Sequence, residues 1–231
     1  MTAEDMRQRL EAISERIAAA AARAGRKKED ILLVGVTKTM PAELINLAAE
    51  CGLRDFGENR VQEYRAKQAE VGFDVRWHII GRLQTNKAKY IAGRVHLIHS
   101  VDSLRLAREL SRQAVKAGHS QDILIEVNIG GEDSKGGVAP SELSGLCRDI
   151  APLPGLKVRG LMTIPPQSGD ARRFFAAMYQ LFIDTADKKI DNISMDYLSM
   201  GMSGDFETAI EEGANIIRVG TALFGERKAK E

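Results

Sequence analysis

The strongest constraint on the fold is an alternation of apolar runs with amphipathic stretches that recurs along the chain. The first run, residues 31–36 (ILLVGV), is almost continuously apolar, as in a strand that is covered on both faces. Further strand-like runs follow at residues 54–57, 77–80, 96–99, 123–127, 158–162, 197–200 and 216–219. Helical stretches separate them, at residues 41–50, 59–69, 86–91, 103–116, 140–150, 170–186 and 206–212. Because a parallel connection needs a crossover, this order predicts an α/β fold with a parallel sheet.

The number of repeats indicates how the sheet closes. Eight strand–helix units in about 200 residues match a (β/α)8 TIM-type barrel at the short end of its usual length. A doubly wound open sheet is the alternative, and periodicity alone does not separate the two; the count favours the barrel. We expect one domain over residues 1–231, with an extra N-terminal helix in 1–28, whose apolar residues recur every three to four positions, and the barrel over 31–225.

Composition argues against several classes of function. The 33 Lys and Arg residues nearly balance the 32 Asp and Glu residues, and aromatic residues make up 5%, so we expect no nucleic-acid partner. Cys51 and Cys147 lie far apart, which disfavours a disulfide framework or a structural zinc site and suits a reducing compartment. The sequence has neither a signal-peptide pattern nor an apolar run long enough to span a membrane. We therefore expect a cytoplasmic protein.

Lys38 is the first candidate for chemistry, because it directly follows the first strand. The carboxyl ends of barrel strands form the active face, and a lysine that loses hydration there has a lowered pKa and a nucleophilic amine. Such an amine can form a Schiff base with an aldehyde or ketone. Position alone favours the alternative, a lysine whose ammonium group reaches solvent.

Two glycine-bearing turns near the C-terminus form a candidate phosphate site. The turns MGMSGD (200–205) and RVGTALFG (218–225) each follow a strand, and Ser203 and Thr221 can add hydroxyl donors to their backbone N–H groups. Barrels often bind phosphate with the loops after the last two strands. Ordinary strand-to-helix turn chemistry is the alternative.

Arg218 lies inside the last strand, where a charge needs a partner. A structural salt bridge is one explanation, and a hydrogen bond to a ring atom of a ligand is the other. A lysine for an aldehyde, a phosphate site and a buried arginine on one face together suggest pyridoxal 5′-phosphate (PLP).

Long motifs then resemble a known family. The sequence is similar to the pyridoxal-phosphate homeostasis proteins, the YggS/PROSC family, from about residue 31 to 225, and their fold is similar to the barrel domain of alanine racemase. The motifs are GVTKT (35–39), FGENRVQE (56–63), WHIIGRLQTNK (77–87), EVNIG…KGG (126–137), GLMTIP (160–165), LSMGMSGDFETAI (198–210) and IRVGTALFG (217–225).

The resemblance implies roles for individual residues. Lys38 would hold PLP as an internal aldimine, and Arg218 would face the pyridine nitrogen. The phosphate would bind Ser203, Gly204, Gly220 and Thr221, and Asn59, His78 and Met202 would line the same pocket. For His78 a hydrogen-bonded barrel residue without a catalytic part is an equal alternative.

We assign no role in a site to five other polar residues. His96 and His99 share a strand at a spacing of three and are expected on opposite faces, so we predict no metal site. Gln84, Asn86 and Lys87 belong to a long motif, but the sequence suggests no more than an anion contact or a helix cap for them.

The sequence favours a carrier over an enzyme. A PLP racemase needs an acid or base on each face of the cofactor, and alanine racemase takes its second base from an added domain. Tyr197 begins a strand, at the wrong end of the barrel, and an arginine at the ring nitrogen makes PLP a weak electron sink. We assign no catalytic residue and expect a monomer that stores, buffers or delivers PLP, with apo PLP-dependent enzymes as partners. The rivals are a racemase-like enzyme of low activity and a Schiff-base aldolase acting on a sugar phosphate.

Overall fold

A closed parallel barrel forms the centre of the molecule. The computed structural model describes residues 1–132, 135–166 and 169–225, and the end of the expected domain, 226–231, lies outside them. Within these ranges eight strands pair in the order of the sequence, and β1 pairs with β8 to close the barrel. The expected TIM-type barrel is therefore confirmed, and the open sheet is excluded. The strands are β1 (Leu32–Val36), β2 (Asp55–Glu58), β3 (Arg76–Ile79), β4 (Leu97–Val101), β5 (Gln121–Glu126), β6 (Leu156–Met162), β7 (Ile193–Ser199) and β8 (Ile216–Val219).

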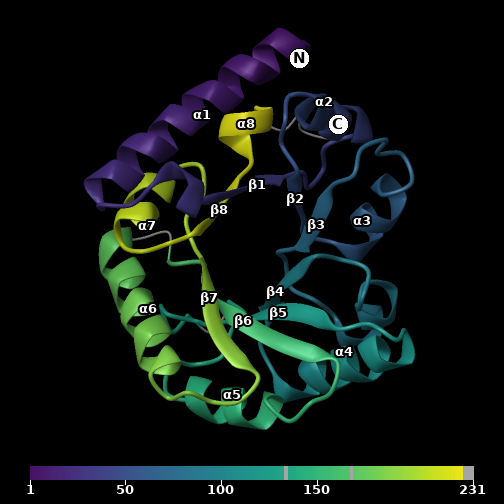
Figure 1. Ribbon diagram of the computed structural model, residues 1–231, viewed down its shortest axis with the longest axis vertical. Helices are drawn as coiled ribbons and strands as arrows, with labels where there is room; N and C mark the ends of the chain where they lie inside the picture. Colours follow the sequence, from purple (N-terminus) through teal and green to yellow (C-terminus); the bar gives the residue numbers. More distant parts are fainter. Residues whose placement is uncertain (133–134, 167–168, 226–231) are drawn as a thin grey trace.

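Helices surround the strands, as Figure 1 shows. The α-helices are α1 (Ala3–Arg23), α2 (Ala42–Glu50), α3 (Val61–Lys67), α4 (Leu104–Lys116), α5 (Leu143–Ile150), α6 (Ala171–Ala186), α7 (Phe206–Glu211) and α8 (Thr221–Phe224), with 3-10 helices η1 (Lys28–Asp30) and η2 (Thr85–Tyr90). None of the helices in the described part of the chain combines the length and the apolar character that crossing a membrane requires.

The extra N-terminal helix, α1, begins and packs as its sequence predicts. Thr2 accepts a hydrogen bond from the Asp5 N–H at 3.1 Å, and the Asp5 carboxylate accepts one from the Thr2 N–H at 2.7 Å, which forms a capping box. Met6, Ile13 and Ile17 are buried along one side of the helix. In Figure 1 the helix lies beside α7 and α8, which it contacts. It therefore covers the last strand–helix units of the barrel.

Two connections differ from the expected helices. The segment after Pro140 first makes a turn, in which the Glu142 N–H donates to the Ala139 carbonyl at 2.9 Å, so that α5 begins only at Leu143. The expected helix at 86–91 is the 3-10 helix η2, which starts at Thr85. Apolar periodicity does not distinguish these tighter turns from an α-helix, since both place apolar residues every three to four positions.

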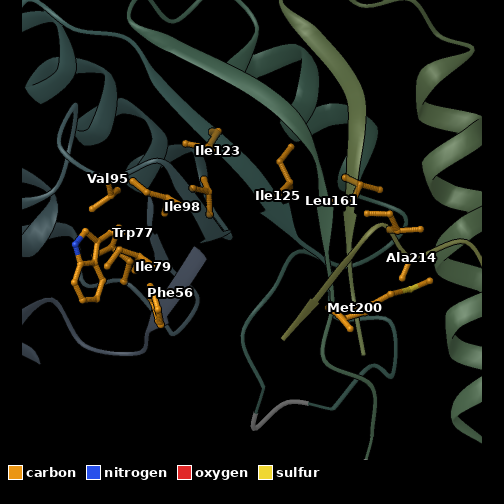
Figure 2. Packing of buried hydrophobic residues seen from close by; sticks show 14 of the residues in the cluster. Phe56, Trp77, Ile79, Val95, Ile98, Ile123, Ile125, Leu161, Met200 and Ala214 are labelled. Carbon is orange, nitrogen blue, oxygen red and sulfur yellow. The ribbon is translucent and has the colours of Figure 1, made fainter. Parts of the chain in front are cut away.

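The apolar core has two parts, because side chains alternate along each strand between the barrel interior and the helices. The larger part fills the layer between strands and helices, where Figure 2 shows Phe56, Trp77 and Ile79 gathered together. The rings of Phe56 and Trp77 lie 6.3 Å apart. The smaller part lies inside the barrel and contains Val34, Leu97, Leu124, Met162 and Ile216. The remaining interior positions include polar residues that bear on the site.

Gly160 marks an irregularity that β6 needs. Residues 123 and 124 of β5 face Val158 and Gly160, so Arg159 is an extra residue that bulges out of the pairing. Gly160 has a φ of +148°, and a Cβ at this position would lie 1.8 Å from the carbonyl oxygen of Tyr197. No side chain fits there unless the paired strands move apart.

We predict that Gly160→Ala lowers the free energy of unfolding by about 3 kcal/mol or more, since the methyl group forces strained backbone and separates β6 from β7. Gly145 lies in α5 with nothing within 4 Å of a built Cβ. The matched change Gly145→Ala is expected to stabilise by about 0.5–1 kcal/mol. Urea unfolding followed by circular dichroism measures both. Equal effects of the two variants would contradict the prediction.

Candidate functional site

A cavity of about 430 Å³ opens where the carboxyl ends of several strands meet. We call it the rim cavity. All of the expected cofactor-binding residues except His78 line it, together with residues that the sequence did not single out. Its walls are formed by Val36, Lys38, Met40, Asn59, Ile80, Gly81, Arg82, Glu126, Ile164, Met202, Ser203, Gly204, Arg218, Gly220, Thr221 and Gly225.

Lys38 reaches this cavity from a tightly held turn after β1. The N–H of Thr37 donates to the Gly57 carbonyl at 3.0 Å, which continues the pairing of β1 with β2. Thr39, on the other side of Lys38, has a φ of +64°, which is uncommon for a β-branched residue. The N–H of Thr39 donates to the Glu63 carboxylate at 2.6 Å. The turn is therefore fixed on both sides of the lysine.

A second lysine, Lys67, is buried and stabilises the same turn. Lys67 of α3 donates to the Thr37 carbonyl at 2.8 Å, to Glu58 at 2.7 Å and to Glu63 at 3.3 Å. The Thr37 hydroxyl donates to the same Glu58 oxygen at 2.7 Å. Burial raises the pKa of Glu58, although its bonds from Lys67 and Thr37 act in the opposite direction. These residues form a charged support whose contacts run to the backbone on either side of Lys38.

The glycine-bearing turns follow β7 and β8, and β8 is the strand that pairs with β1. Ser203 Oγ accepts hydrogen bonds from the N–H groups of Gly220 and Ala222, each at 3.3 Å. These two N–H groups and the hydroxyl therefore converge on one point of the cavity wall. The space beside Gly204 is open, since a Cβ built on it meets nothing within 4 Å. The arrangement can accept an anion with several oxygens.

Arg218 enters the rim cavity from inside the barrel. It is 3% exposed, and burial lowers the pKa of its guanidinium group to about 10, with the charges of Glu126 and Asp205 acting in the opposite direction. It stays protonated at neutral pH. Within the described ranges no carboxylate lies within ion-pair distance of it. It donates instead to Ser199 Oγ at 2.6 Å and to the Thr163 carbonyl at 2.9 Å. The structural salt bridge that sequence left open is not what holds it.

His78, which the sequence placed in the same pocket, is not among the residues that line the rim cavity. Its ring is fully buried inside the barrel, where Nδ1 lies 2.9 Å from His99 Nε2 and Nε2 lies 3.0 Å from Asp55 Oδ1. The alternative, a hydrogen-bonded barrel residue, describes it. The expected separation of His96 from His99 is wrong, since both rings pack edge-on against His78 at 5.3 and 5.2 Å. His96 precedes β4, so strand alternation does not apply to it. Among the described residues no group of side chains suits a metal ion.

Glu126 is an acidic cavity residue that the sequence did not reveal. It is the last residue of β5, and its inward position places a carboxyl group in the rim cavity. Burial raises the pKa of Glu126 to about 7, and the charge of Asp102 adds to this, while Arg218 and Arg82 oppose it. The apolar run suggested a strand ending at Val127, one residue later. A strand end placed one residue earlier would have revealed this group.

A larger groove of about 910 Å³ adjoins the rim cavity and shares Asn59 and Arg82 with it. Gln84, Asn86 and Lys87 line this groove and not the rim cavity. The long motif WHIIGRLQTNK therefore runs from the barrel interior, past the cavity, into the neighbouring surface. Tyr197 lines a separate cavity with Arg76 and His96, at the opposite end of the strands, as expected. It does not begin its strand, however, because β7 starts four residues earlier, at Ile193.

Comparison with known proteins adds to this geometry. Residues 8–228 match the family described as alanine racemase, N-terminal domain. The chain is 50% identical to the pyridoxal phosphate homeostasis protein of Aquifex aeolicus, over 96% of this chain and 98% of that protein. It is 37% identical to PipY of Synechococcus elongatus, a structure solved with PLP bound, with a TM-score of 0.82 over 92% of this chain and all of that one.

A more distant likeness concerns the fold alone. An alanine racemase of Clostridium difficile is 17% identical, with a TM-score of 0.74, and the match covers 98% of this chain and 58% of that chain. The expected likeness to the barrel of alanine racemase is thereby confirmed.

We predict that Lys67→Met lowers the free energy of unfolding by about 3 kcal/mol or more, because it leaves the Glu58 carboxylate buried without its cation. The double variant Lys67→Met with Glu58→Gln should recover more than half of the lost stability, because a neutral amide carries no charge to bury. Lys157→Met, on the exposed face of β6, is the control and should stay within about 0.5 kcal/mol of the wild type. Urea unfolding measures all three. A double variant that is as unstable as Lys67→Met would contradict the role of the buried charge.

Proposed function

The chain belongs to the family of pyridoxal phosphate homeostasis proteins, and from that premise we propose that it binds PLP in the rim cavity and serves the intracellular supply of the cofactor. One observation carries the proposal: Lys38, Arg218 and the Ser203–Gly204 turn, which match three different parts of PLP, line a single cavity. A volume of about 430 Å³ lies in the range of small-molecule pockets.

The phosphate group fits the turns after β7 and β8. Gly220 and Ala222 direct their N–H groups to one place, Ser203 adds a hydroxyl group, and Gly204 leaves space beside them. Thr221 also lines the rim cavity. We assign the phosphate to this cradle, with Asn59 and Met202 as further walls of the pocket.

We assign the aldehyde end to Lys38. Bound PLP supplies an aldehyde that condenses with a primary amine, and a ring that draws electrons from the product. Lys38 Nζ would form this bond with loss of one water. The fixed turn around Lys38 supports the assignment, because it keeps the amine at the cavity when the bond to the cofactor is broken.

Arg218 supports a carrier more than a catalyst. Since its pKa, about 10, stays well above neutral, it would donate a hydrogen bond to a ring nitrogen without giving up the proton. An unprotonated ring withdraws electrons weakly, which disfavours the breaking of bonds in a bound amino acid. We therefore propose storage, buffering or delivery of PLP. Apo PLP-dependent enzymes as recipients, a monomeric state and a cytoplasmic location remain predictions.

Glu126 keeps a second candidate open. The sequence suggested no second acid or base, but the rim cavity holds a carboxyl group whose pKa, about 7, suits proton transfer at neutral pH. A slow exchange of the α-proton of an amino acid, with Glu126 as the base, is the activity that this group would allow.

We predict that purified protein mixed with PLP shows the visible absorption band of a PLP Schiff base, and that borohydride fixes PLP to the peptide containing Lys38. Lys38→Ala should lose both signals, whereas the control Lys87→Ala, in the adjoining groove, should keep them. No band in the wild-type protein would refute PLP binding and would favour the sugar-phosphate aldolase. A fixed adduct elsewhere, with the Lys38 peptide unmodified, would refute the assignment of Lys38.

We predict that α-proton exchange, followed by NMR on a panel of amino acids in heavy water, stays far below the roughly 10 s⁻¹ of a typical enzyme. Any exchange that occurs should rise with pH through about 7, as the carboxyl group loses its proton, and should disappear in Glu126→Gln. Rapid exchange that requires Glu126 would make the protein an enzyme and reject the carrier.

A further inference from the structure

Five buried polar side chains form a continuous line of hydrogen bonds through the barrel. Arg218 Nη1 donates to Ser199 Oγ at 2.6 Å, Ser199 Oγ lies 2.9 Å from His99 Nδ1, His99 Nε2 lies 2.9 Å from His78 Nδ1, and His78 Nε2 lies 3.0 Å from Asp55 Oδ1. Each of these residues is at most 3% exposed. They come from β8, β7, β4, β3 and β2. We call this line the interior chain.

The two ends of the interior chain fix the direction of every bond in it. A guanidinium group can only donate, and an ionised carboxylate can only accept. Burial would raise the pKa of Asp55, but hydrogen bonds from His78 and Arg76 outweigh it and lower the pKa, so Asp55 is an ionised acceptor. His78 must then donate through Nε2. At the other end, Ser199 Oγ accepts from Arg218, so its hydroxyl proton is directed to His99 Nδ1. His99, which burial keeps neutral, then carries its proton on Nε2 and donates it to His78 Nδ1.

Both histidines are neutral in this arrangement. A proton added to His99 Nδ1 would leave the Ser199 hydroxyl without its acceptor and would place a second positive charge next to Arg218. In agreement with this, the pKa of His99 lies well below its usual value, because of burial and of the neighbouring His78 and Arg218. The ring of His96, which packs against His78, also has a lowered pKa, chiefly from burial.

The interior chain connects opposite ends of the barrel. Asp55 also accepts a hydrogen bond from Arg76 Nε at 2.7 Å, and Arg76 is half exposed. Arg76 lines a cavity of about 370 Å³ with Tyr197 and Asn215, at the amino ends of the strands. Arg218 lines the rim cavity at the carboxyl ends. A buried arginine without a direct carboxylate partner is thus linked to a carboxylate through three intervening side chains.

We propose that the interior chain positions Arg218 for its ligand and couples the rim cavity to the Arg76–Asp55 ion pair at the far end of the barrel. Each hydrogen bond polarises the next one, so the negative charge of Asp55 strengthens the hydrogen bond between the guanidinium group and Ser199. Because Arg218 donates one N–H to Ser199 Oγ and another to the Thr163 carbonyl, the orientation of the guanidinium plane is fixed. Ser199, His99, His78 and Asp55 are positioning residues, since they act through Arg218. The coupling to PLP rests on the proposed function, whereas the hydrogen bonds of the interior chain do not.

The hydrogen bonds of the interior chain are tested first, in the protein without added ligand. Nitrogen-15 NMR of the histidine rings should find the proton on Nε2 in both His78 and His99. The His99 ring should stay neutral between pH 8 and pH 6, a range of about two units around the ordinary pKa of histidine. Ser199→Ala should alter the His99 signals, and Arg76→Met, a change at a half-exposed site, should alter those of His78. Protonated rings, the other tautomer, or signals unmoved by both variants would overturn the inference.

The coupling is tested by titration with PLP. Arg76→Met should weaken PLP binding about two- to tenfold and shift the pH profile of its absorption, although Lys38 is intact and borohydride still fixes PLP to it. Arg159→Met, which removes another partly exposed, ion-paired arginine outside the chain, is the control and should leave both readouts unchanged. Arg76→Met with wild-type affinity and absorption would overturn the coupling. Failure of the wild-type protein to bind PLP would instead refute the proposed function, and the histidine signals would still decide whether the interior chain exists.

Discussion

Closure of the parallel sheet is the constraint on which the rest of the structure depends. Once β1 pairs with β8, every inward side chain shares one narrow interior, and every strand ends at the same rim. Residues far apart in the sequence, such as Lys38 and Ser203, then become walls of one cavity. Little water reaches charged side chains that point inward, so their hydrogen-bond partners must come from the other strands.

The protein satisfies its buried charges in two different ways. Beneath the Lys38 turn, Lys67 and Glu58 pair directly; Lys67 also donates to the Thr37 carbonyl, and Glu58 accepts from the Thr37 hydroxyl. Inside the barrel, Arg218 and Asp55 stand at the ends of a line of neutral groups. The direct pair secures the place where a covalent bond to a ligand would form. The extended line leaves the guanidinium group available to the cavity while its charge is compensated from a distance.

The sequence predicted the fold almost completely, because strands covered on both faces appear as apolar runs and their number indicates closure. Most of the rim cavity was predictable too, since its residues directly follow those runs. The exceptions have physical causes. His78 belongs to a strand and points inward, below the rim, where a residue-by-residue search for strand ends cannot place it. Glu126 depends on a strand boundary that is one residue earlier than the apolar run suggests. Lys67 comes from a helix, and the interior chain requires neighbours on five strands, which only the closed barrel brings together.

The pairing of β1 with β8 also has a consequence for the order of folding. The first strand finds its second neighbour only in the last one, and α1 packs on α7 and α8, which are among the final elements of the described chain. Arg16 and Arg23 of α1 reinforce this contact through ion pairs with Glu207 and Glu211. A chain emerging from the ribosome can therefore form its early strand–helix units but cannot complete the rim. Since the turns proposed to hold the phosphate follow β7 and β8, the proposed cavity should be complete only after these two strands have been synthesised and paired.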